Sequence, residues 1–198
     1  MKLFEIQNSL HKAGLTLFTT AEFRRVTAMS ATGSRKFLLR YTNLGCFWQL
    51  RRGLYALREG SLHLWVVANK LYRPSYISLE TALSYHGLIP ETIYGVTSVT
   101  TRTTREFEAC ETVFLYHSLK KQAYTGYGPM TIDGATVLVA EPEKAVADYL
   151  YFVHLGRKEW NDRLRSQQLN QQKLWKYLEL FERKHLLSWG RNVIKKKP

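Results

Sequence analysis

The chain has 198 residues, of which 45% are hydrophobic, and carries a formal net charge of +13 at pH 7. This apolar content can build one large core or two smaller ones. No apolar run approaches the ~20 residues that a helix needs to cross a bilayer. The composition therefore excludes a transmembrane helix, and we expect no membrane partner.

Charge is segregated along the chain. Residues 1–68 hold ten basic and three acidic side chains, residues 69–154 hold seven and nine, and residues 155–198 hold twelve and four. This pattern predicts two domains, a small basic one at residues 1–68 and a larger one at residues 69–198 that ends in a basic helical tail.

The two cysteines, Cys46 and Cys110, fall in different predicted domains. Neither has a neighbour at metal-ligand spacing, and no secretory signal accompanies them. We therefore interpret both as buried, reduced thiols of a cytoplasmic protein.

Two helices with a very short connection are predicted near the start of the chain. Thr20 is a candidate N-cap for the first helix, whose inner face carries Phe23 and Val26. Ser30 is a second candidate N-cap only ten residues later. This spacing leaves room for a tight turn alone and is typical of a helix-turn-helix motif.

The second of these helices begins near Ala31 and is the candidate recognition helix. Beyond it, two strands at residues 47–50 and 54–57 flank Arg51-Arg52-Gly53, which favours a short hairpin with glycine in a positive-φ turn. The combination predicts a winged helix-turn-helix that binds double-stranded DNA. The predicted DNA contacts are Thr32, Ser34, Arg35, Lys36, Arg40, Arg51 and Arg52. The alternative for each charge is an ordinary solvated surface, but the charge segregation favours DNA.

The second domain mixes helices with strands. Residues 62–68 are expected to be a strand or a short buried segment, and residues 69–74 a polar linker. A helix from Ser78 to His86 precedes several Thr- and Val-rich strands that predict an antiparallel sheet, with a hairpin at Asp133-Gly134. A helix follows from Pro142, and spaced leucines predict further amphipathic helices in the tail. The predicted fold class is α+β.

Three ordered passages resemble the AbiEi-type antitoxins, a family of transcriptional regulators of bacterial viral-defence systems. They are LRRGLYAL at 50–57, YISLETALSYHGLIP at 76–90 and AEPEKAVAD at 140–148. The resemblance covers about residues 20–155. It implies a type IV toxin–antitoxin regulator whose winged helix represses its own operon and whose second domain counteracts a nucleotidyltransferase-like toxin. Direct contact with that toxin is left open.

A metal-dependent nucleic-acid-processing enzyme is the alternative function. Glu141, Glu143, Lys144, Asp148 and Asp133 superficially suggest a metal-dependent nuclease. Their spacing argues against a shared metal site, and we expect Glu143 to satisfy first-turn amides and Lys144 to form a weak surface pair with Asp148.

No cofactor, metal site or catalytic residue is predicted, because the histidines are scattered and no phosphate-binding loop is present. One group of aromatic side chains is open to two interpretations, a binding face or a half-buried sheet surface. Its members are Tyr85, Tyr94, Tyr116, Tyr124 and Tyr127.

Overall fold

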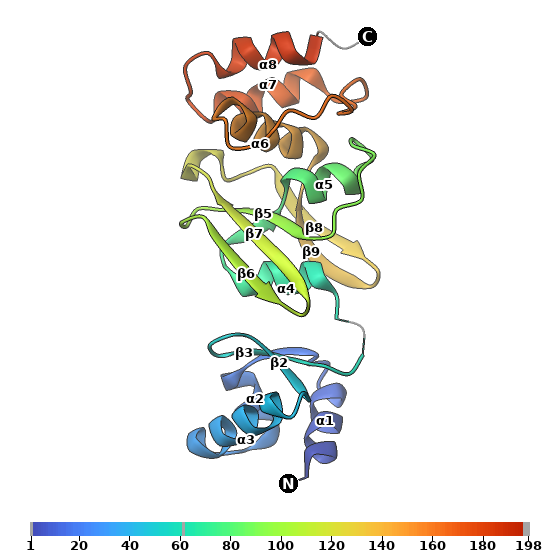
Figure 1. Cartoon of the computed structure of the whole chain (residues 1–198), viewed down its shortest axis with the longest axis vertical. Coiled ribbons are helices and arrows are strands. Elements are labelled where there is room, and N and C mark those ends of the chain that lie inside the picture. Colours follow the sequence, from blue (N-terminus) through green and yellow to red (C-terminus); the bar gives the residue numbers. More distant parts are fainter. Residues whose placement is uncertain (1, 61, 196–198) are drawn as a thin grey trace. The chain divides into compact units, whose positions relative to one another are not determined.

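A computed structural model describes residues 2–60 and 62–195 (Figure 1). Contacts divide the chain into two units, each described by itself below. The first comprises residues 1–67 and 108–111, and the second comprises residues 68–107 and 112–198. Both are built from helices and strands, so the fold is α+β.

The first unit consists of helices and a small antiparallel sheet with the strand order β1-β3-β2. Its elements in chain order are α1 (Leu3–Lys12), β1 (Leu17–Thr19), α2 (Thr20–Thr27), α3 (Ala31–Asn43), β2 (Phe47–Arg51) and β3 (Leu54–Leu57). The two strands expected around Arg51-Arg52-Gly53 are confirmed as β2 and β3. Sequence analysis did not predict the first helix or the first strand.

The caps of α2 and α3 follow local side-chain chemistry. Thr19, one residue before the predicted Thr20, is the N-cap of α2, because its hydroxyl accepts from the Glu22 amide (3.2 Å) while the Glu22 carboxylate accepts from the Thr19 amide (2.7 Å). Ser30 is confirmed as the N-cap of α3, with its hydroxyl accepting from the amide of Gly33 at 3.1 Å.

An aromatic cluster forms the core of the first unit. Phe18 of β1 stacks on Phe23 of α2 with 5.7 Å between ring centroids, and it meets the edge of Phe47 of β2 at 6.0 Å. Fully buried aliphatic side chains complete this core, namely Ile6, Leu10, Leu38 and Leu57. The cluster joins α1, α2, α3 and the sheet, so it fixes the orientation of α3 on its support.

The second unit is built on a six-stranded sheet with the order β6-β7-β5-β4-β9-β8, although the last two residues of β6 are grouped with the first unit. The strands are β4 (Ser75–Ile77), β5 (Val96–Thr100), β6 (Arg105–Ala109), β7 (Thr112–Ser118), β8 (Tyr127–Ile132) and β9 (Ala135–Ala140). The Asp133-Gly134 hairpin is confirmed, with both residues at positive φ. However, β4 pairs with β9 and β5 with β7 in parallel, so the sheet is mixed and the antiparallel prediction was wrong. Strand composition indicates burial but does not indicate the direction of the neighbouring strand.

Residues 62–74 differ from expectation. Residues 64–71 form helix α4 (Leu64–Leu71), so the strand alternative for residues 62–68 was wrong, the alternative of a short buried segment is compatible with the structure, and the helix extends into the expected linker. A short apolar run fits a buried helix as well as a strand, and here tertiary contacts decide. The Asn69 side chain bonds both the N–H (2.6 Å) and the C=O (3.3 Å) of Leu138, and the Tyr116 hydroxyl donates to the carbonyl of Ala68 at 2.7 Å.

The remaining helices gather around α6, which contacts α5, α7, α8 and β9 (Figure 1). Their bounds are α5 (Leu79–Tyr85), η1 (Lys121–Ala123), α6 (Pro142–His154), α7 (Gln171–Glu179) and α8 (Leu186–Lys195). Pro142 occupies the first turn of α6, as predicted. Among the residues that the structure describes, no helix is both long enough and apolar enough to cross a membrane.

Candidate nucleic-acid interface

A three-residue turn connects α2 to α3. It contains Ala28, which adopts the left-handed conformation (φ 54°), followed by Met29 and the N-cap Ser30. The left-handed residue ends α2 abruptly and lets the chain start a new helix almost at once. This is the spacing expected for two helices that pack as a helix-turn-helix pair.

The exposed face of α3 is continuous along the whole helix. At about 100° per residue, its members span about 140° of the circumference, while Ser34 and Leu38 lie on the buried side. We call the set the α3 face, and it consists of Thr32, Arg35, Lys36, Leu39, Arg40 and Asn43. Four of the predicted contact residues therefore share one exposed surface.

Ser34 is not on this face, in contrast to the prediction. Its side chain is fully buried, and its hydroxyl donates to the carbonyls of Ser30 (2.8 Å) and Ala31 (3.1 Å) within the same helix. A short hydroxyl side chain near a helix start readily bonds the backbone of the preceding turn. Ser34 therefore stabilises the first turn of α3, and we omit it from the candidate contacts.

The α3 face keeps its positive charge. In the described part of the chain, Arg35 and Lys36 form no ion pair with an acidic side chain, and the Arg40 guanidinium lies 5.6 Å from the ring centroid of its neighbour Tyr41. The carboxylates of Glu5 and Glu22 accept hydrogen bonds from backbone amides at the starts of α1 and α2. An incoming anion would thus meet uncompensated cations.

The β2–β3 hairpin supplies a second exposed basic element. Arg51 ends β2 and Arg52 lies in the turn, where Gly53 adopts a φ of +80° that favours glycine. Both arginines are exposed, and the Arg51 guanidinium donates to the Arg52 carbonyl at 3.3 Å. Sequence reasoning missed Arg58, whose guanidinium lies 4.1 Å from the Trp48 ring centroid. The hairpin register could have indicated this Arg58–Trp48 contact, because it pairs Trp48 with Ala56 and Arg58 lies only two residues after Ala56.

Three of the four carboxylates considered for a metal nuclease, Glu141, Glu143 and Asp148, already bind other groups of the protein. Asp148 accepts from Lys144 Nζ at 2.5 Å through one oxygen, and from the hydroxyls of Ser78 (2.7 Å) and Tyr76 (3.0 Å) through the other. Both charged side chains are completely buried. The prediction of a weak surface pair was therefore wrong. Burial raises the pKa of Asp148, while the Lys144 ammonium and the two hydroxyls oppose that rise.

Glu141 and Glu143 bind a lysine from α7 instead of a metal. Lys173 Nζ lies 2.7 Å from Glu141 and 3.7 Å from Glu143, and the hydroxyl of Tyr177 donates to Glu141 at 2.6 Å. The hydrogen bond from Lys173, followed by that from Tyr177, lowers the pKa of Glu141. Glu143 accepts from the amide of Asn170, not from first-turn amides of its own helix, so that prediction was wrong. Among the described residues, no three His, Cys, Asp or Glu side chains are grouped to hold a metal.

The five tyrosines do not form a single face. Tyr116 is buried, and Tyr124 and Tyr127 pack on Tyr76 with ring centroids 5.0 and 4.3 Å away. The remaining two are exposed, Tyr85 by 43% and Tyr94 by 91%. The sheet-surface interpretation therefore describes three of them better than a common binding face.

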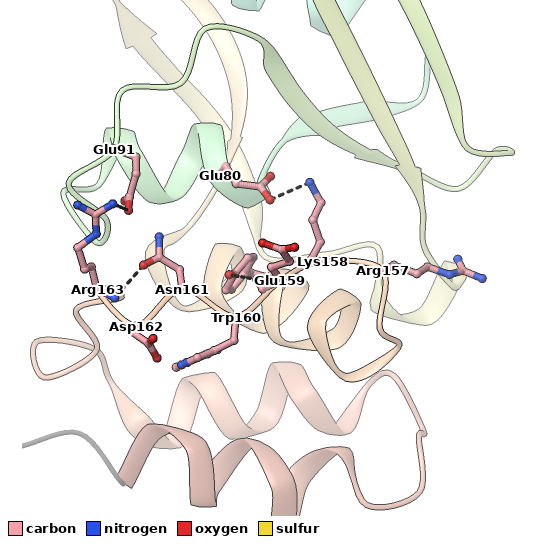
Figure 2. A pocket seen from close by; sticks show the side chains of 10 residues that line it. Glu80, Glu91, Arg157, Lys158, Glu159, Trp160, Asn161, Asp162 and Arg163 are labelled. Carbon is pink, nitrogen blue, oxygen red and sulfur yellow. Dashed lines mark hydrogen bonds and ion pairs between the residues drawn. The ribbon is translucent and has the colours of Figure 1, made fainter.

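An open cleft of about 610 Å³ lies between α5, α6 and the segment after α6 (Figure 2). Two ion pairs across it join Lys158 to Glu80 (2.7 Å) and Arg163 to Glu91 (2.5 Å). Its other lining residues are Tyr149, Arg157, Glu159, Trp160, Asn161 and Asp162. Because both charge signs are mixed and largely paired with each other, the cleft favours no one class of ligand. Sequence analysis did not predict this cleft, because its lining comes from three separate segments.

A scan against models of known protein families and a search of curated proteins each found no match to this chain.

Proposed function

We propose that the first unit is a winged helix-turn-helix that binds double-stranded DNA, with α3 in the major groove and the β2–β3 hairpin as the wing. The short α2–α3 turn supports this assignment, as does the aromatic core that holds α3 in place. A helix of this kind fits the major groove, and a basic hairpin beside it fits the neighbouring phosphate backbone.

The observation that carries the proposal is the α3 face. Arg35, Lys36 and Arg40 project from one exposed surface and lack acidic partners among the described residues. Such cations release condensed counterions when they neutralise phosphates, and arginine also reads guanine through two hydrogen bonds. Asn43 adds a side chain that pairs with adenine.

The proposal extends to an autorepressor and antitoxin. Its basis is the resemblance of the passages at 50–57, 76–90 and 140–148 to AbiEi-type regulators. On this proposal the chain binds an operator at its own gene and its second unit counteracts a nucleotidyltransferase-like toxin. The partners are then operator DNA and, directly or through its targets, that toxin.

The DNA-binding proposal is tested by selection from a random pool of duplexes with the full-length protein, followed by titration of the enriched sequence. We expect the triple variant Arg35→Ala, Lys36→Ala, Arg40→Ala to lose both affinity and sequence preference. A matched control removes the same charge from exposed lysines of the second unit, namely Lys120, Lys121 and Lys176. Equal losses in both triple variants would reject α3 as the reading element.

The antitoxin proposal is tested separately by co-expression. A nucleotidyltransferase-like reading frame beside this gene is induced with and without the full-length chain, and growth is measured. Rescue of growth by the chain, including its α3 triple variant, is the expected result. Continued arrest with soluble, folded protein present would reject the antitoxin role but leave DNA binding untouched.

A further inference from the structure

The α3 face carries one apolar side chain among polar ones. Leu39 is 59% exposed, and its five companions on the face are hydroxyl, amide or cationic side chains. It also lies near the middle of the face, at about 40° from Arg35 and about 40° from Asn43 around the helix. Leu39 is too exposed to belong to the core, to which this helix contributes Leu38.

The position of Leu39 along the helix places it between two polar side chains of the α3 face. Arg35 lies one turn before it and Asn43 one turn after it, each displaced by ~6 Å along the axis. Successive bases on one strand are about 3.4 Å apart. A helix lying in the major groove would therefore bring Leu39 over a base between those reached by its two polar neighbours.

The edges of bases in the major groove are hydrogen-bond donors and acceptors, with one apolar exception, the 5-methyl group of thymine. A leucine pressed against a polar edge removes water from that edge and offers no hydrogen bond, which is unfavourable. Against a methyl group the same leucine buries apolar surface on both partners. Leu39 therefore has one favourable base partner in the groove.

We propose that Leu39 is a specificity-determining residue that recognises the methyl group of a thymine in the major groove. This inference rests on the proposed DNA-binding function, and it names one base that the positively charged α3 face would recognise. Loss of one buried methyl contact lowers affinity ~4-fold.

The probe is the duplex enriched from the random pool, bound by full-length protein in a fluorescence anisotropy titration. Each thymine is replaced in turn by deoxyuridine, which removes the methyl group and keeps every hydrogen-bonding group. We expect one replacement in each recognised site to weaken wild-type binding ~4-fold, the size of one methyl contact. The same replacement should leave the affinity of Leu39→Ala unchanged.

Leu44→Ala is the matched control. Leu44 is 63% exposed at the end of the same helix but lies off the α3 face, so this variant should keep the wild-type response to deoxyuridine. Wild-type binding that is indifferent to every deoxyuridine replacement overturns the inference, as does an unchanged response in Leu39→Ala. Failure to enrich or bind any duplex would instead reject the proposed function, and the inference with it.

Discussion

Lys144 and Asp148, one turn apart on α6, form an ion pair from which solvent is excluded entirely. The Lys144 ammonium lies 4.8 Å from the Phe181 ring centroid. The Asp148 carboxylate accepts hydrogen bonds from the hydroxyls of Tyr76 in β4 and of Ser78 at the start of α5. The pair thereby connects α6 to elements about 70 residues earlier in the chain. Ser78, with which the predicted helix begins, occupies the N-cap position of α5 but donates its hydroxyl to Asp148 and caps no backbone amide with its side chain.

Removing one partner of this pair should strongly destabilise the protein. We expect Asp148→Ala to lower the free energy of unfolding by about 3–5 kcal/mol, because it leaves the Lys144 ammonium buried and uncompensated. The double variant Lys144→Met, Asp148→Leu should recover part of that loss, since it buries no charge but leaves the hydroxyls of Ser78 and Tyr76 without their acceptor. Urea unfolding of the full-length protein measures both.

The exposed pair between Lys173 and Glu141 supplies the comparison. Both side chains are 42% exposed, so solvent screens their attraction, and Lys173→Ala should cost no more than about 1 kcal/mol. A similar loss for Lys173→Ala and Asp148→Ala would contradict the view that burial makes the Lys144–Asp148 pair exceptional.

His117 should make the second unit sensitive to mild acid. Burial, assisted by the charge of Lys158, lowers the pKa of His117 from 6.5 to about 4. Between pH 6.5 and pH 4 the unfolded chain binds a proton at His117 that the folded chain does not. The free energy of unfolding therefore keeps its full value above pH 6.5 and decreases as the pH falls toward 4. Urea unfolding at pH 7.5 and pH 5 should show a smaller difference for His117→Gln than for wild type. Carboxylates contribute equally to both proteins, and an identical pH dependence would exclude His117 as a source of the effect.

Gly126 should tolerate a side chain poorly. A Cβ added there would lie 2.6 Å from Cζ of Tyr177, whose hydroxyl is held by Glu141, and the backbone has a φ of +73°. Gly134 has a similar φ of +77° but open space around it. We expect Gly134→Ala to cost roughly 1–2 kcal/mol for the left-handed backbone alone, and Gly126→Ala to cost a further ~1–3 kcal/mol from overpacking. Equal losses in thermal unfolding would show that Tyr177 moves aside freely.

The wing should contribute affinity without sequence preference. Replacing Arg51 and Arg52 by alanine should weaken binding to all duplexes by a similar factor and reduce the slope of log K against log salt by ~2, if both contact phosphate. Titrations of the enriched duplex and of a scrambled one at several salt concentrations measure this. An unchanged slope would remove the wing from the proposed interface.

Local sequence was sufficient for the features that depend on a few neighbouring residues. Ser30 identified the start of α3 because a cap needs only its own hydroxyl and the amide of Gly33. Asp133-Gly134 identified a hairpin because the turn itself requires positive φ. Helical spacing likewise placed Arg35, Lys36 and Arg40 on one side of α3, since that periodicity belongs to the helix alone.

Only the tertiary structure decided burial and strand direction. Nothing within α6 distinguishes the Lys144–Asp148 spacing from a surface pair, because the groups that enclose it come from β4, the start of α5 and the turn after α7. The same holds for the parallel pairing of β4 with β9 and for the helical state of residues 64–71, which Asn69 stabilises through Leu138. These outcomes depend on contacts between residues from 37 to 72 positions apart, and no short window of sequence contains both partners.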